Sequence, residues 1–211
     1  MSSRQLSNIF IVAAKRTPFG SFGGSFKSIS ATELGVTATK AALAQASIDP
    51  AIVDAVFVGN VIPSSKDAAY LARHVGLKSG IPIHTPALTI NRLCGSGFET
   101  VIQGANSIRL GDAKVTVCGG TENMSMAPLQ VNGEHARWGV ALGQGMVLGD
   151  SLWDGLTDAH AGVPMGMTAE NLAMQYGITR EVSAHNHPIM HKRHLAPQHS
   201  RKLFNKQTAM R

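Results

Sequence analysis

Apolar residues in the first eighty positions alternate between short runs and helical spacing, and this alternation predicts a series of strands and helices. Residues 9–14 form an apolar run that is β-branched at three positions and followed by a proline and glycines. Such a run is typical of a buried strand that leads into a loop. Thr32 and Glu33 open a stretch with apolar residues at helical spacing. A strand within residues 53–60 and a helix over residues 68–75 are predicted next.

The most regular alternation follows. The pattern predicts a strand, a turn, a helix and a second strand, in that order, over residues 87–90, 91–97, 98–110 and 115–118. Within the helix, Val101, Ala105 and Ile108 share one face, and Gly111 ends it. Strands that alternate with helices indicate an α/β fold in which neighbouring strands are parallel.

The order breaks between residues 127 and 166, where glycines and isolated aromatic residues predict a long loop or excursion. Thr168 is a candidate N-cap for a short helix beyond it. After Glu181 no apolar period remains, and five of the nine histidines fall between positions 185 and 199. We therefore expect an α/β core over residues 1–127, a loop region over 128–181, and a divergent, disordered tail over 182–211.

The net charge of +6 suggests a nucleic-acid ligand until the charges are located. Residues 1–181 carry 13 basic and 13 acidic residues, whereas residues 182–211 carry six basic residues and no acid. The whole excess therefore lies in the tail, and a basic tail is more often solvated than a reader of nucleic acid. The body of the chain offers no electrostatic case for binding nucleic acid.

The chain has only two cysteines, Cys94 and Cys118, which favours a reducing compartment over a disulfide framework. No run of 18 apolar residues predicts a membrane span. The first 32 residues contain basic residues and no acid, which is compatible with mitochondrial import. Because residues 9–14 fit a core strand better than a removable presequence, the targeting question stays open.

Cys94 is the residue whose position suggests chemistry. It follows a predicted strand and precedes a predicted helix, with Gly95 and Gly97 on either side of Ser96. Helix amides at such a position would stabilise a thiolate and a developing oxyanion, and glycines would let a bulky thioester approach. The alternative is that Cys94 is a small buried apolar residue, the usual role of a free cysteine. Spacing alone leaves both interpretations open.

Four segments in family order resemble the thiolases. They are Val12-Ala-Ala-Lys-Arg-Thr-Pro-Phe-Gly20, Asn91-Arg-Leu-Cys-Gly-Ser-Gly97, Cys118-Gly-Gly-Thr-Glu-Asn-Met-Ser125 and Met167-Thr-Ala-Glu-Asn-Leu172. Each motif alone is a weak signal, but together they are specific and span residues 9 to about 181. Ser151-Leu-Trp153, Thr157-Asp158 and Pro164-Met165 favour the 3-ketoacyl-CoA thiolase branch over the biosynthetic acetyltransferases.

The resemblance implies a layered α/β/α fold, with the loop region beginning a domain that covers coenzyme A. It implies that Cys94 forms an acyl-thioester during thiolytic cleavage of a 3-ketoacyl-CoA in fatty-acid β-oxidation, or in the reverse condensation. Coenzyme A would be a substrate, with no permanently bound cofactor. Met165 would line the acyl pocket. The resemblance further implies a homodimer or tetramer in the mitochondrial matrix, with the cytoplasm as the alternative location.

Thiolase chemistry also uses an NEAF, a GHP and a CxGGG motif from the second half of the family sequence, and none of them occurs here. The resemblance is expected to end at Glu181, where a shifted reading frame or an alternative exon would produce such a change of composition. Two functional hypotheses follow. The chain is a thiolase-type acyltransferase with little turnover alone, or an inactive subunit that binds a full-length thiolase as a dimerisation module.

The remaining candidates favour structural roles. Cys118 lies on a predicted buried strand and is expected to pack in the core. Gly119 and Gly120 resemble a tight turn and match no phosphate-binding pattern. The tail histidines have no acid or cysteine nearby, so we expect no metal site.

Overall fold

The computed structural model describes residues 8–184, and contacts divide the chain into two units, Met1–Gly155 and Leu156–Arg211. The predicted boundaries at residues 127 and 181 stay predictions. The predicted tail lies almost entirely outside the described residues.

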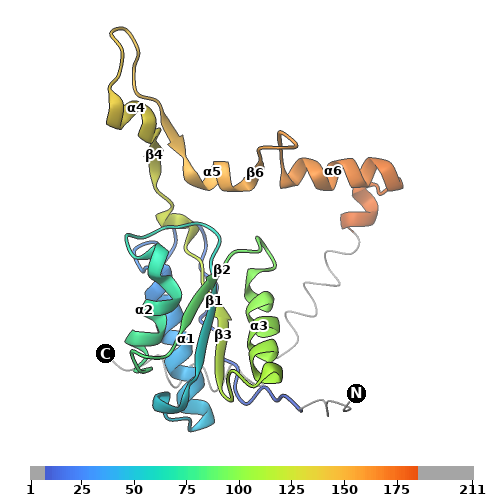
Figure 1. Cartoon of the computed structure of the whole chain (residues 1–211). Helices are drawn as coiled ribbons and strands as arrows, with labels where there is room; N and C mark the ends of the chain where they lie inside the picture. The colour runs from blue at the N-terminus through green and yellow to red at the C-terminus, as the bar shows by residue number, and fades with distance from the viewer. Residues whose placement is uncertain (1–7, 185–211) are drawn as a thin grey trace, which may run out of the picture. The chain divides into compact units, whose positions relative to one another are not determined.

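A three-stranded parallel sheet forms the centre of the first unit (Figure 1). Its strands, in spatial order, are β2 (Ala87–Ile90), β1 (Ala55–Gly59) and β3 (Thr116–Gly120). Phe57 of β1 is in register with Leu88 of β2 and with Cys118 of β3. The strands at all three predicted positions are therefore confirmed. Gly119 and Gly120 belong to β3, so the prediction of a tight turn at these glycines is wrong.

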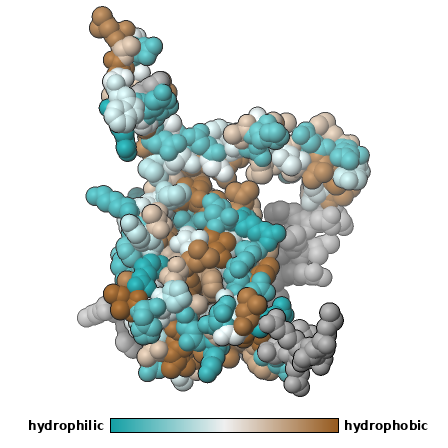
Figure 2. All heavy atoms as spheres, in the orientation of Figure 1, coloured by the Kyte–Doolittle hydropathy of each residue, from teal (hydrophilic) through white to brown (hydrophobic). Residues whose placement is uncertain are grey.

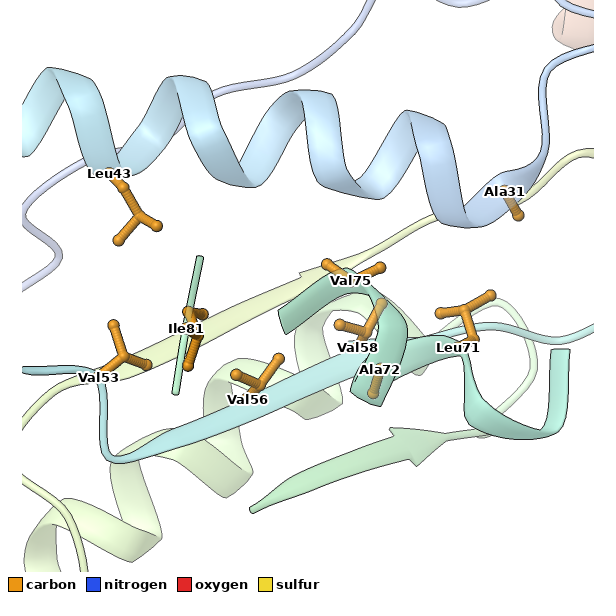
Figure 3. Packing of buried hydrophobic residues seen from close by; sticks show 9 residues of the cluster. All are labelled: Ala31, Leu43, Val53, Val56, Val58, Leu71, Ala72, Val75 and Ile81. Carbon is orange, nitrogen blue, oxygen red and sulfur yellow. The ribbon is translucent and has the colours of Figure 1, made fainter. Parts of the chain in front are cut away.

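Helices cover both faces of this sheet. Helices α1 (Ala31–Ala46) and α2 (Leu71–Lys78) cover one face, and α3 (Ser96–Leu110) covers the other (Figures 1 and 3). A short 3-10 turn, η1 (Pro50–Ile52), precedes β1, and another, η2 (Ala68–Tyr70), leads into α2. The predicted α/β/α layers are thus confirmed.

Local signals explain the helix ends. The Ser30 hydroxyl accepts the Glu33 N–H, and the Glu33 carboxylate accepts the Ser30 N–H, which together form a capping box at the start of α1. Gly111 ends α3 with φ of 86°, a left-handed conformation that glycine adopts without steric cost.

The apolar core lies between the sheet and the α1/α2 pair (Figure 3). Successive side chains of a strand point to opposite faces, so Val56 and Val58 of β1 face this core while Phe57 and Gly59 face α3. The buried cluster consists of Ala31, Leu43, Val53, Val56, Val58, Leu71, Ala72, Val75 and Ile81.

The other face is packed with small and polar residues. The buried residues of α3 are Ser96, Thr100 and Gly104, one helical turn apart. Val101 remains 44% exposed, although it belongs to the apolar face singled out from the sequence. Further exposed apolar residues on α3 are Phe98, Ile102 and Leu110, and Figure 2 shows apolar side chains on the surface of this unit.

Residues 9–14 are not a strand, so this prediction is wrong. Phe10, Ile11 and Val12 are at least two-thirds exposed. A strand requires hydrogen bonds from a partner, and no strand among the described residues pairs with this segment.

The excursion after Ala127 contains short regular elements where a loop was predicted. After η3 (Met124–Met126), β4 (Leu129–Val131) pairs antiparallel with β5 (Leu148–Asp150). Between them lies α4 (Gly133–Trp138), and α5 (Ser151–Leu156) follows.

The described residues of the second unit include a two-residue antiparallel pair and the helix that follows it. The pair is β6 (Thr157–Asp158) with β7 (Val163–Pro164), and the helix is α6 (Met165–Tyr176). The N-cap of α6 is Pro164 and not Thr168, which lies inside the helix. The helix begins earlier than predicted because a proline with φ of −75° is compatible with a helix start.

Candidate active site

The turn between β2 and α3 carries Cys94 and is closed by its own hydrogen bonds. The Gly95 N–H donates to the Arg92 carbonyl at 3.0 Å, and the Ser96 N–H donates to the Leu93 carbonyl at 2.9 Å. Leu93 adopts φ of 49°, a left-handed conformation that is unusual for a residue with a side chain. This backbone leaves Cys94 exposed at the carboxyl end of β2.

Ser96, the first residue of α3, stabilises this turn with two hydrogen bonds. Its hydroxyl oxygen accepts a hydrogen bond from the Arg92 N–H at 2.8 Å, and its O–H donates to the Leu93 carbonyl at 2.6 Å. The residue is 4% exposed, so both bonds are shielded from water. Ser96 therefore ties both residues that precede Cys94 to the first turn of α3.

Two glycines allow α3 to approach the ends of the strands. A Cβ atom at Gly59 of β1 would lie 2.7 Å from the Ser96 carbonyl carbon. A Cβ atom at Gly120 of β3 would lie 3.3 Å from the Gly97 Cα atom. A side chain at Gly59 would collide with the Ser96 backbone and one at Gly120 would crowd Gly97, so these glycines let the Cys94 turn lie close to the carboxyl ends of β1 and β3.

The start of α3 has groups that can stabilise negative charge. Its N-cap residue is Gly95, and among the described residues no side-chain hydrogen bond caps this end of the helix. The amides of Gly95 and Ser96 already donate to carbonyls of the turn, so the next first-turn amides of α3 are the ones that can face an anion, and the helix dipole is positive at this end. Arg92 forms an ion pair with Glu99 beside the turn. The pKa of Glu99 is lowered by the hydrogen bond from Gln103 and, second, by that from Arg92.

Glu122 joins the carboxyl ends of β1 and β3. Its carboxylate accepts hydrogen bonds from the Asn60 side chain at 2.9 Å, the Val61 N–H at 2.9 Å and the Ile62 N–H at 3.2 Å. Burial raises the pKa of Glu122, and these hydrogen bonds oppose the rise.

The next two polar residues of this segment hold the glycine-rich loop near the amino terminus. The Asn123 side-chain amide donates to the carbonyls of Phe26 and Ile29, and the Ser125 hydroxyl accepts the Gly23 N–H. The polar residues between Cys118 and Ser125 therefore hold the segments around the strand ends in place by hydrogen bonds.

Cys118 is a packing residue, as expected. It is half-buried, its thiol donates to the Thr116 hydroxyl at 3.6 Å, and burial raises the pKa of this thiol. A Cβ atom at Gly104 of α3 would lie 2.4 Å from its sulfur atom. Cys118 thus fills the contact between β3 and α3.

Met165 is the first residue of α6 and is 49% exposed. It belongs to the second unit, whereas Cys94 belongs to the first. The acyl-pocket role of Met165 therefore stays a prediction.

Within residues 8–184, no group of three metal-binding side chains is found. The tail histidines lie outside this range. None of the helices in the same range has the length and apolar character needed to cross a bilayer.

Sequence reasoning assigned chemistry to Cys94 but missed the polar residues that support it, namely Asn60, Asn91, Ser96, Glu122 and Asn123. All except Asn60 lie inside the two quoted motifs around Cys94 and Cys118. A run of polar residues directly after a strand was the available signal.

A parallel α/β/α layer with an exposed cysteine at the junction of strand and helix is an arrangement in which the cysteine can serve as a nucleophile. Residues 9–201 match the model of the thiolase N-terminal domain, and the chain belongs to the thiolase family. The match extends past Glu181, where we expected the resemblance to end.

Relatives of this chain are enzymes. It is 54% identical over 176 residues to the rat mitochondrial 3-ketoacyl-CoA thiolase, covering 83% of this chain and 44% of that protein. With the same coverage it is 44% identical to the acetyl-CoA acetyltransferase of Pseudomonas aeruginosa. The chain therefore spans less than half the length of these curated relatives.

Solved thiolase structures are similar to this chain in both fold and sequence. The human mitochondrial 3-ketoacyl-CoA thiolase in complex with CoA superposes with a TM-score of 0.79 at 55% identity, covering 82% of this chain and 43% of that one. The Ascaris suum Acat5 thiolase, also solved with coenzyme A, gives 0.75 at 35% identity.

Proposed function

We propose that this chain provides the nucleophile of a thiolase reaction, in which Cys94 accepts the acyl group of a 3-ketoacyl-CoA. The observation that carries this proposal is the position of Cys94, exposed on a hydrogen-bonded turn directly before α3. The names of the relatives support the choice of substrate class.

The proposed reaction begins when the Cys94 thiolate attacks the keto carbon of the substrate. The carbon–sulfur bond forms, and the carbonyl oxygen gains a negative charge that the amides at the start of α3 can stabilise. The bond between the keto carbon and the α-carbon then breaks, and the leaving enolate takes a proton to become acetyl-CoA. A second CoA thiolate takes the shortened acyl group from Cys94.

Several finer parts of the proposal rest on the family. Coenzyme A acts as a substrate, Met165 lines the acyl pocket, and the assembly is a homodimer or tetramer in the mitochondrial matrix. Because the chain spans less than half of its relatives, we also propose that turnover at an enzyme-like rate needs a base from the remaining part of the family fold, whereas slow acetylation of Cys94 proceeds without it. That part lies in this or another polypeptide.

The second candidate function is a binding module for a full-length thiolase. The exposed apolar residues of α3, including Phe98 at 62% and Ile102 at 44%, favour it. Co-purification of the chain with a full-length thiolase, lost in the Phe98→Ser variant, would support this candidate.

The main proposal is tested by trapping the acyl-enzyme. The purified chain is mixed with acetoacetyl-CoA, quenched in acid and mapped by peptide mass spectrometry. We expect an acetyl group on Cys94, none in Cys94→Ala, and unchanged labelling in Cys118→Ala as the matched control. Acetylation at Cys118, or equal acetylation of both cysteines, would contradict the proposal.

A further inference from the structure

A continuous hydrogen-bonded path links Glu122 to the turn that carries Cys94. The Glu122 carboxylate fixes the backbone directly after β1 by accepting the N–H groups of Val61 and Ile62. The Val61 carbonyl then accepts a hydrogen bond from the Asn91 side-chain nitrogen at 3.2 Å. The segment after β1 and the segment after β2 are joined in this way.

The side-chain oxygen of Asn91 makes a second hydrogen bond, within the turn that carries Cys94. This oxygen accepts the Leu93 N–H at 3.0 Å. Leu93 is the residue with φ of 49°, a conformation that persists only where the surroundings hold it. Asn91 therefore connects the fixed backbone at Val61 to the strained residue next to Cys94.

We propose that Asn91 and Glu122 are positioning residues for Cys94, acting through the backbone of residues 61 and 93. The inference rests on the proposed function, since it assumes that the orientation of the Cys94 thiol matters for acyl transfer. Neither side chain is required to touch the substrate. Each restricts the turn to the one conformation that presents the sulfur beside the first turn of α3.

The same sheet contains a matched control at its opposite end. The Asp54 carboxylate, directly before β1, accepts the N–H groups of Lys114 and Val115 at 2.7 and 2.9 Å. Asp54 and Glu122 thus both use a carboxylate to join β1 and β3 through backbone amides. Only Glu122 is connected to the Cys94 turn.

The test compares the alkylation rate of Cys94 by iodoacetamide in the full chain and in four variants. In Glu122→Gln an amide N–H2 replaces one acceptor oxygen, and in Asn91→Ala both bonds of the bridge are lost. We expect both to lower the Cys94 rate about tenfold, toward its value in the urea-unfolded chain, because a loosened turn no longer orients the thiol. Asp54→Asn should leave the rate unchanged.

Asn91→Asp separates positioning from general stability. It keeps the acceptor for the Leu93 N–H but loses the donor to Val61, so its rate should lie between wild type and Asn91→Ala. The Cys118 rate in each sample reports whether the fold is intact. If Glu122→Gln unfolds, the exposed Asn91 variants decide the question.

A Cys94 rate that is equal in wild type and both Asn91 variants would overturn the proposal. So would an equal loss in Asp54→Asn and Glu122→Gln. Acetylation by acetoacetyl-CoA is measured in parallel on the wild-type chain. Failure of that acetylation contradicts the proposed function, whereas acetylation with unchanged variant rates contradicts only the positioning roles.

Discussion

The two faces of the central sheet are packed with different kinds of side chains. Toward α1 and α2 the sheet presents valines to a sealed apolar cluster in which Leu71 and Val75 are each 1% exposed. Toward α3 it presents Phe57 together with glycines, Thr116 and Cys118, and the buried residues of that helix are Ser96, Thr100 and Gly104.

This difference indicates that one face mainly stabilises the unit and the other mainly positions the candidate site. Burial of large apolar side chains on the first face supplies most of the free energy of folding. The smaller residues on the second face bury less apolar area, but they let the start of α3 lie against the strand ends, next to the proposed nucleophile Cys94. Four apolar side chains of α3 point to solvent as a consequence.

The largest effect is expected on the sealed face. Leu71→Ala should lower the free energy of unfolding by about 2–5 kcal/mol, because it leaves a cavity in a packed cluster. Denaturant unfolding measures the change. Ile83→Ala, at a side chain that is 76% exposed, is the control and should change stability by less than about 0.5 kcal/mol. Equal effects of the two substitutions would show that the cluster is not the core.

The close contact on the other face is tested by adding a methyl group. Gly104→Ala should cost about 1–3 kcal/mol, since its Cβ would lie 2.4 Å from the Cys118 sulfur. Gly97→Ala on the same helix has nothing within 4 Å and should be nearly neutral. In a double-mutant cycle, Cys118→Ala should recover part of the loss. No recovery would place the strain elsewhere.

The carboxylate of Asp67, the N-cap residue of η2, makes an acid-sensitive contact with His74 of α2. Hydrogen bonds from Ser65 and His74 to Asp67 lower its pKa from 3.8 to about 2, the first outweighing the cost of burial. A lowered pKa stabilises the fold above the ordinary value, and this contribution is lost as pH falls from about 3.8 toward 2.

Asp67→Asn should therefore lower stability at neutral pH by about 1–2 kcal/mol, reduced from the full shift by partial exposure. Unfolding curves recorded from pH 6 to pH 2 should converge for wild type and variant near pH 2. A difference that stays constant over this range would contradict the assigned cause.

The smallest effect on stability is expected at the exposed apolar residues of α3. Ile102→Ser should change the free energy of unfolding by less than about 0.5 kcal/mol, because the side chain is already 44% exposed. Light scattering should nevertheless show less self-association than in wild type. Asn106→Ser, on the exposed side of the same helix, is the matched control. A large loss of stability in Ile102→Ser would mean that this face is buried.

Local signals in the sequence predicted the fold between Ala87 and Cys118 closely. Strand β2 has the predicted bounds, and Gly111 ends α3 as its freedom at positive φ requires. The run at residues 9–14 misled because apolar character can predict burial but cannot supply a partner strand.

The candidate site was predictable only in part. The position of Cys94 on a turn between strand and helix could be predicted from its neighbours in sequence, whereas its choice as the candidate nucleophile rested on the resemblance to thiolases. The polar residues after each strand marked Glu122 and Asn91 as candidates, but their roles could not be predicted, because these depend on contacts with Val61 at separations of 61 and 30 residues. Contacts of that range follow from the parallel register of the three strands and not from local spacing.

The central claim is that Cys94, and not Cys118, is the acyl acceptor. The most direct measurement treats the full chain with limiting iodoacetamide, with and without prior acetoacetyl-CoA, and quantifies label on both cysteines by mass spectrometry. Prior treatment with CoA alone shows how much shielding comes from binding. We predict that Cys94 is labelled first, that acetoacetyl-CoA protects it more than CoA does, and that Cys118 is unaffected. Faster labelling of Cys118, or protection of Cys94 by CoA alone to the same extent, would contradict the account.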